Sequence, residues 1–152
     1  MDNRLLLKAT KIYGSPIYLY DLEKIKFQLI KFKKSFRSID NIKIQYAAKA
    51  LSNISILKFI KNLGCGLDAV SIQEIILGIK AGFKANDIIY TPNGVSIEEI
   101  IEANNLGVKL NLDSIESIEE FSKNFPNKSI FIRINPNIFD GGNDKTRVGH
   151  SE

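Results

Sequence analysis

The sequence predicts an α/β fold and, within that class, the N-terminal part of a (β/α)8 barrel. Short runs rich in β-branched residues alternate with helical patterns from residue 42 onward, which requires parallel strands joined by right-handed crossovers. The predicted strands end at regular intervals, and this regularity favours a closed barrel over an open doubly wound sheet. No Gly-x-Gly-x-x-Gly motif follows any predicted strand, so the dinucleotide-binding form of the open sheet is disfavoured.

Five strands are predicted, at residues 42–48, 66–70, 87–90, 108–112 and 129–134. Their carboxyl ends fall near residues 49, 70, 90, 112 and 134, so successive ends are 20 to 22 residues apart. A step of this size holds one strand, one helix and two short loops. Because a complete barrel needs eight strands and about 250 residues, we expect these 152 residues to hold about five units, with the C-terminal barrel units absent.

Each helix that follows a strand has a predicted start signal. These signals are Asn53, Ser71 with Glu74, Ser96 with Glu99, and Asp113 with Glu116. Serine followed three residues later by glutamate matches the capping box, which satisfies free N–H groups at a helix start. Gly64, Gly82 and Gly107 are expected to end three of these helices in the left-handed conformation.

A different unit precedes the repeat. Residues 15–20 predict a short strand, and Asp21 is a plausible N-cap for an amphipathic helix at residues 22–36. We therefore expect two parts: an N-terminal strand and helix at residues 1–38, and a partial barrel at residues 39–152.

The composition excludes several classes of function. With 44% hydrophobic and 25% charged residues, the chain is typical of soluble globular proteins. The net charge of +4 comes from lysines scattered among glutamates without an arginine cluster, so we expect no nucleic-acid partner. No apolar run approaches about 18 residues, and no secretory leader is evident, so we expect no membrane association.

The single cysteine, Cys65, cannot form an internal disulfide and fits a reducing, cytoplasmic location. No cysteine, histidine and carboxylate set has metal-ligand spacing, so no metal site is expected.

Lys49 is the candidate for covalent chemistry. It closes the first predicted strand between Ala48 and Ala50, just before a helix start. A Schiff-base lysine needs a fixed stem and room for a carbonyl ligand, and this position offers both. A lysine that ends a strand is most often a solvated side chain, so the hypothesis depends on the barrel pattern that follows it.

Several stretches together resemble the fold type III pyridoxal-phosphate-dependent decarboxylase family, and in particular its diaminopimelate decarboxylase branch. The stretches are Gly14-Ser15-Pro16-Ile17-Tyr18-Leu19-Tyr20-Asp21, Tyr46-Ala47-Ala48-Lys49-Ala50, Gly66-Leu67-Asp68-Ala69-Val70-Ser71 with Glu74, Arg133-Ile134-Asn135-Pro136-Asn137, and Gly141-Gly142 leading to Val148-Gly149. The Thr146-Arg147-Val148-Gly149 segment departs from the usual Thr-Gly before Ser-Lys-Phe-Gly.

The resemblance implies an N-terminal barrel, a C-terminal β-domain that receives the first strand, and a homodimer with shared active sites. It also implies pyridoxal 5'-phosphate as the cofactor. In the diaminopimelate branch, meso-2,6-diaminopimelate is converted to L-lysine and carbon dioxide. The β-domain, the glycine-rich phosphate loop, the acid that pairs with the pyridine nitrogen and the partner's cysteine come later in the family, so we expect this chain to be inactive alone.

The resemblance also implies roles for individual residues. Lys49 would form the Schiff base, with its ammonium pKa lowered by burial near the cofactor. Strand alternation would place Gln45, Ala47 and Lys49 on one face, where Ala47 leaves room for the cofactor. Asp68 would lie near the cofactor and the lysine, and Arg133 would join the cofactor's hydrogen-bond network.

Simpler interpretations remain open at this point. Asp68 could be a structural acid at a helix entrance, and Arg133 could belong to an ordinary ion pair. His150 is not assigned the family's catalytic histidine role, which belongs to a later strand. The substrate could instead be arginine, ornithine or carboxynorspermidine, or the chain could be a noncatalytic truncated product.

Overall fold

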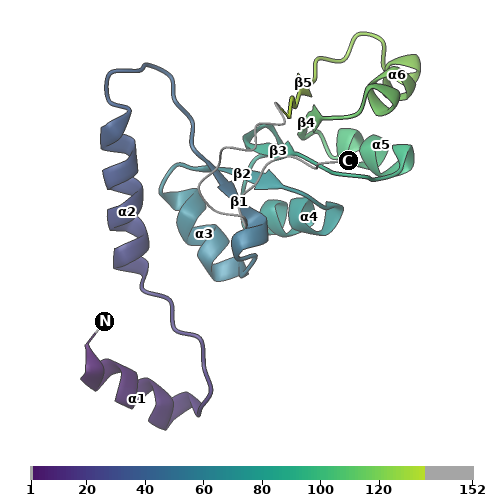
Figure 1. Ribbon diagram of the computed structural model, residues 1–152. Coiled ribbons are helices and arrows are strands. Elements are labelled where there is room, and N and C mark those ends of the chain that lie inside the picture. The colour runs from purple at the N-terminus through teal and green to yellow at the C-terminus, as the bar shows by residue number, and fades with distance from the viewer. Residues whose placement is uncertain (1, 136–152) are drawn as a thin grey trace. The chain divides into compact units, whose positions relative to one another are not determined.

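The computed structural model describes residues 2–135 and divides the chain into two compact units, Met1–Ile42 and Lys43–Glu152. The first unit contains the helices α1 (Asn3–Tyr13) and α2 (Leu22–Ser35). The second contains a β-sheet with helices, drawn from blue through teal to yellow-green in Figure 1.

Within the described residues, the second unit contains a five-stranded sheet in which every neighbouring pair is parallel. The strands are β1 (Gln45–Ala47), β2 (Gly66–Ala69), β3 (Ile88–Tyr90), β4 (Lys109–Leu112) and β5 (Phe131–Ile132). They lie in sequence order across the sheet. All five predicted strands are therefore confirmed, although each is shorter than predicted.

Helices connect consecutive strands. They are α3 (Ile54–Asn62), α4 (Ile72–Lys80), α5 (Ile97–Asn105) and α6 (Ile115–Asn124), with short 3₁₀ turns at Ala48–Ala50 and Ala85–Asp87. Right-handed crossovers between sequential neighbours place every helix on the same face of the sheet, as Figure 1 shows for α3 to α6. A doubly wound sheet would reverse direction and use both faces. The sequential order is that of a (β/α)8 barrel, and the prediction of a partial barrel is confirmed.

The helix boundaries follow the predicted caps with one correction. Asn53, Ser71 and Ser96 each accept a backbone hydrogen bond at a helix start. The prediction of Asp113 as the cap of α6 is wrong, because the Ser114 hydroxyl accepts from the Ser117 N–H at 3.2 Å.

The predicted C-terminal glycines are also confirmed. Gly64, Gly82 and Gly107 have φ values of 80°, 94° and 77°. This left-handed conformation lets the chain leave each helix without a steric penalty.

Alternation along the strands builds the core. Leu67, Ile88, Tyr90 and Leu110 are at most 1% exposed and pack with buried residues of the helices. α4 approaches β2 closely at Gly78, where an added Cβ would lie 2.4 Å from Leu67 Cδ2. The apolar positions therefore fix which face of each strand turns toward the helices.

The first unit differs from the prediction. Residues 15–20, predicted as a strand, form neither strand nor helix. A strand needs a neighbour to receive its backbone hydrogen bonds, and the described part of this unit contains only helices. The helix that starts after Asp21 is confirmed, since the Asp21 carboxylate accepts from the Lys24 N–H at 3.0 Å.

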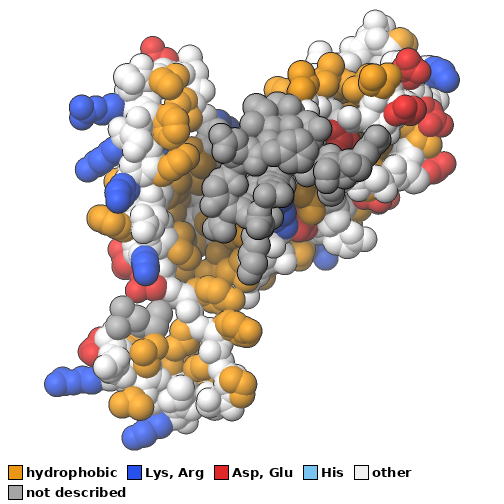
Figure 2. All heavy atoms as spheres, viewed as in Figure 1, with side chains coloured by type: hydrophobic (Ala, Val, Ile, Leu, Met, Phe, Trp, Pro, Cys, Tyr) orange, Lys and Arg blue, Asp and Glu red, His pale blue; other side chains and the backbone are white. Residues whose placement is uncertain are grey.

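The helix α1 was not predicted. Its side chains are all outside the core, and hydrophobic side chains of α1 and α2 remain visible on the molecular surface in Figure 2. None of the described helices is long and apolar enough to cross a membrane.

Tyr90 provides a test of core packing through the pH dependence of stability. Burial raises the pKa of its phenol, and its hydrogen bond to the Glu99 carboxylate raises it further. Above pH 10.0, the reference value, the unfolded chain loses this proton while the folded chain keeps it. The free energy of unfolding should therefore fall as pH rises, by at most about 1.4 kcal/mol per pH unit for this group.

Tyr90→Phe should remove this contribution and give a shallower decline above pH 10, measured by chemical unfolding at several pH values. The control Phe121→Leu removes core packing without an ionisable group, so it should lower stability while keeping the wild-type slope. Equal slopes for wild type and Tyr90→Phe would contradict the assignment.

Candidate functional site

The cavity side of the sheet is formed by the strand positions that alternate with the core. Leu67 and Ala69 of β2 are fully buried with the helices, so the intervening Asp68 and the following Val70 face the other way. The same alternation turns Ile89 away from the buried Ile88 and Tyr90.

A cavity of about 440 Å³ lies on this face. Its lining residues are Gln45, Lys49, Asp68, Val70, Ile89, Thr91, Asn111 and Arg133. Five of the chain's strands or strand ends contribute, because the carboxyl ends of parallel strands meet at one edge. An amine, a carboxylate and a guanidinium therefore share one cavity.

Lys49 lies in the 3₁₀ turn Ala48–Ala50 and not on β1, which ends at Ala47. The fully buried Ala48 anchors this turn, and the Tyr46 hydroxyl donates to the Leu51 carbonyl at 3.1 Å across it. The prediction that strand alternation extends to residue 49 is wrong, because the backbone turns first. The lysine nevertheless lines the cavity.

The side chain of Lys49 is exposed, in contrast to the buried ammonium expected from the sequence. Lys49 and the following Ala50 are both exposed in this turn, whereas Ala48 is fully buried. Ala47 is paired in register with Asp68 of β2 but is not among the residues that line the cavity.

Asp68 belongs to a polar network that crosses three strands. The Thr91 hydroxyl donates to Asp68 Oδ1 at 2.8 Å, and Asn111 Nδ2 donates to Thr91 Oγ1 at 3.3 Å. All three side chains are half-buried and line the cavity. Ser71, and not Asp68, caps the helix that follows β2, so a capping role for Asp68 is excluded.

Arg133 directly follows β5, and its N–H donates to the Leu112 carbonyl at 2.8 Å. This bond extends the pairing of β4 and β5 by one residue and fixes the backbone of Arg133 at the cavity edge. No ion pair of Arg133 is found within residues 2–135. Its half-buried guanidinium is available to an anionic ligand.

Gln45 adds an unsatisfied polar atom to the cavity. Its Oε1 is buried and has no hydrogen-bond partner among the described residues. A buried acceptor without a donor is costly unless a ligand or water supplies one. Together with the Lys49 amine, the Asp68 carboxylate and the Arg133 guanidinium, this set of donors and acceptors fits a ligand that carries a carbonyl and anionic groups, as pyridoxal phosphate does.

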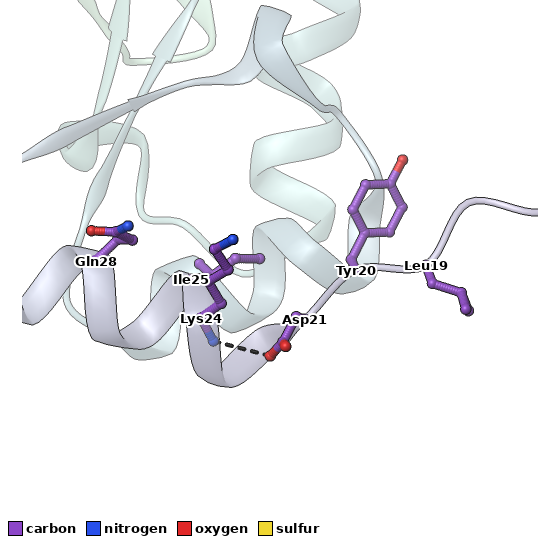
Figure 3. A pocket seen from close by; sticks show the side chains of 6 residues that line it. All are labelled: Leu19, Tyr20, Asp21, Lys24, Ile25 and Gln28. Atoms are coloured by element: carbon purple, nitrogen blue, oxygen red, sulfur yellow. Dashed lines mark hydrogen bonds between the residues drawn. The ribbon is translucent and has the colours of Figure 1, made fainter. Parts of the chain in front are cut away.

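A larger hollow lies within the first unit, around the start of α2. It is lined by Leu19, Tyr20, Asp21, Lys24, Ile25 and Gln28, as Figure 3 shows. The side chain of Asp21 is engaged there as the helix cap. The site with convergent reactive groups is therefore the cavity of the second unit.

Several predicted positions lie outside the described residues, namely Pro136, Asn137, Gly141, Gly142, Val148, Gly149 and His150. Within residues 2–135, no cluster of histidine, cysteine and carboxylate side chains could hold a metal ion.

Thr91 and Asn111 were missed by sequence reasoning. Both are polar residues at the carboxyl ends of strands, where the alternation with buried Tyr90, Leu110 and Leu112 turns them toward the cavity. That alternation is visible in the sequence and could have identified them.

Comparison with known proteins shows to which family the chain belongs. Residues 22–152 match the family model for the pyridoxal-dependent decarboxylases, described as their pyridoxal binding domain. The match covers most of the chain, and the chain belongs to this family.

Several matching relatives are diaminopimelate decarboxylases. The enzyme from Helicobacter pylori strain J99 is 43% identical over 131 residues, which are 83% of this chain and 32% of the relative. The Campylobacter jejuni enzyme is 36% identical over the same shares. The chain thus spans about a third of the length of the curated relatives it matches.

Solved structures of decarboxylases share the fold of this chain. The Helicobacter pylori diaminopimelate decarboxylase complexed with L-lysine matches with a TM-score of 0.77 and 38% identity, over 88% of this chain and 35% of that one. An ornithine decarboxylase from Entamoeba histolytica matches with a TM-score of 0.74 and 26% identity, over 86% and 42%. The fold is therefore shared by decarboxylases with different substrates.

Gly66 provides a test of the packing around Gln45, which lines the cavity. A Cβ at this position would lie 2.0 Å from Gln45 Oε1 and 2.6 Å from the Asp87 carbonyl oxygen. Gly66→Ala should displace the Gln45 side chain and lower the free energy of unfolding by about 1–3 kcal/mol, measured by chemical unfolding.

The double substitution Gly66→Ala with Gln45→Ala should recover part of this loss, because the side-chain overlap is removed. Gln45→Ala alone is the matched control. Additive effects of the two substitutions would contradict the close packing of Gln45 on Gly66.

Proposed function

We propose that this chain supplies the lysine-bearing part of the active site of a pyridoxal-phosphate-dependent decarboxylase. The proposed reaction converts meso-2,6-diaminopimelate to L-lysine and carbon dioxide. The observation that carries the proposal is the convergence of Lys49, Asp68 and Arg133 on one cavity in a chain of the pyridoxal-binding family.

Each residue has a role that its chemistry can perform. Lys49 would hold the cofactor through its amine, which can condense with the carbonyl of the cofactor and release water. Asp68 stabilises positive charge next to that amine, and Arg133 binds an anionic group of the cofactor or substrate. Ala47 keeps the adjacent strand position small. The bound cofactor supplies an electron sink for the charge left when carbon dioxide departs.

The substrate assignment is supported by the names of the curated relatives and by the Arg133-Ile134-Asn135-Pro136 sequence. This sequence argues against the ornithine branch. Arginine, ornithine and carboxynorspermidine remain alternative substrates, since the fold is common to an ornithine decarboxylase.

We further propose that the active protein is a cytoplasmic homodimer. The chain has a single cysteine, the buried Cys65, and this cysteine usage is in keeping with a reducing compartment. Activity should require more than this chain, which spans about a third of its relatives. A noncatalytic product is the alternative if the cofactor is never taken up.

The cofactor attachment is tested with the longest form of the protein that its gene encodes. After incubation with pyridoxal phosphate and reduction with borohydride, mass spectrometry should find the pyridoxyl group on Lys49. Lys49→Arg keeps a positive charge but lacks a nucleophilic amine, so it should abolish the modification. The exposed Lys58→Arg serves as the matched control. Modification that persists in Lys49→Arg would refute the assignment.

The substrate is tested by carbon dioxide release from meso-diaminopimelate, arginine, ornithine and carboxynorspermidine. We expect kcat/KM for meso-diaminopimelate to exceed the others by at least about a hundredfold, because polar groups left unmatched in a site are strongly rejected. A higher value for one of the other three would transfer the assignment to that substrate.

A further inference from the structure

The hydrogen bonds between Asp68, Thr91 and Asn111 have a fixed direction. An ionised carboxylate only accepts hydrogen bonds, so the single hydroxyl proton of Thr91 is committed to Asp68 Oδ1. The oxygen of that hydroxyl is then an acceptor, and it receives Asn111 Nδ2. The chain of donors runs from β4 through the end of β3 to β2.

These side-chain hydrogen bonds are not required to pair β2 with β3. The Thr91 N–H already donates to the Ala69 carbonyl at 2.8 Å, which ties β3 to β2 at this level. The residues that pack the sheet against the helices point to the opposite face. The three polar side chains lie on the cavity side, where they hold no apolar packing together.

The network also sets the position of Asp68 independently of Lys49. Within residues 2–135, no ion pair or hydrogen bond joins Lys49 to Asp68. Thr91 is the side chain that holds Asp68 Oδ1, while the neighbouring lining residues Val70 and Ile89 are apolar. Asp68 Oδ2 has no hydrogen bond in the described part of the chain.

We propose that Thr91 and Asn111 are positioning residues that hold the Asp68 carboxylate ready for the Lys49-bound cofactor. This inference rests on the proposed function and adds two residues to its site. The carboxylate is oriented before the cofactor binds, so no reorientation is needed when positive charge develops beside it.

The test uses the longest form of the protein that its gene encodes, with pyridoxal phosphate as the probe. Thr91→Val removes the hydroxyl and keeps the branched shape, whereas Thr91→Ser keeps the hydroxyl. Thr10→Val makes the same change on the exposed surface of α1. Titration by absorbance gives the Kd of the cofactor and the ratio of its absorbance bands, and thermal unfolding without cofactor reports stability.

Thr91→Val should raise the Kd about tenfold, the effect of one hydrogen bond to a charged group at the lower end of its range, and should change the band ratio. Thr91→Ser and Thr10→Val should stay within about twofold of wild type. Asn111→Leu should raise the Kd of the cofactor less than Thr91→Val does. In the Thr91→Val background it should cause no further increase in the Kd, because Asn111 acts through Thr91.

The inference is overturned if Thr91→Val binds the cofactor with the wild-type Kd and band ratio. It is also overturned if Thr91→Ser fails to restore binding, or if the effects of Thr91→Val and Asn111→Leu are additive. If Thr91→Val does not fold, Thr91→Ala takes its place with the same expected and contradicting results.

Lys49→Arg, measured in parallel, separates the two proposals. Loss of covalent attachment in Lys49→Arg together with wild-type behaviour of Thr91→Val overturns the positioning role alone. Retained attachment in Lys49→Arg overturns the proposed function itself.

Discussion

The packing of one sheet face against the helices is the constraint on which the site depends. Leu67, Tyr90 and Leu110 are buried on that face of β2, β3 and β4. A shift of one residue in any strand would turn these apolar side chains toward the cavity and bring Asp68 or Asn111 into the core. Such a shift would expose apolar area and bury a charge, so the register is strongly specified.

This strand register determines the positions of the residues that line the cavity. Parallel strands in sequential order bring their carboxyl ends to one edge. In β2, β3 and β4 the cavity residues Asp68, Ile89 and Asn111 lie next to core positions. Lys49, Asp68 and Arg133 are separated by 84 residues from first to last, yet they line one cavity. Apolar packing therefore positions Asp68, and strand pairing positions Arg133. The hydrogen bond from Thr91 refines the orientation of the Asp68 carboxylate.

Much of this architecture could be predicted from the sequence because the signals are local. Strand centres, helix caps such as Ser71 and Ser96, and left-handed glycines such as Gly82 follow from short patterns. The turn at Ala48–Ala50 was not predicted, since nothing in alternating apolar residues shows where a strand ends and a tight turn begins.

The first unit was predicted less well. The helix α1 was not predicted, although Leu5, Ala9 and Ile12 recur at helical intervals. The structure buries none of its residues. Residues 15–20 have the composition of a strand, but strand formation depends on a neighbour that composition alone does not reveal. Thr91 and Asn111 belong to no motif. Alternation with buried neighbours could have placed them at the cavity, but their hydrogen bonds join residues of different strands and could not be predicted from local patterns.

The most direct measurement is a crystal structure of the longest form of the protein with pyridoxal phosphate bound. The account predicts continuous electron density between Lys49 Nζ and the cofactor, with Asp68 and Arg133 lining the same cavity. Cofactor density at another lysine, or a Lys49 side chain directed away from the cavity that Asp68 lines, would contradict it.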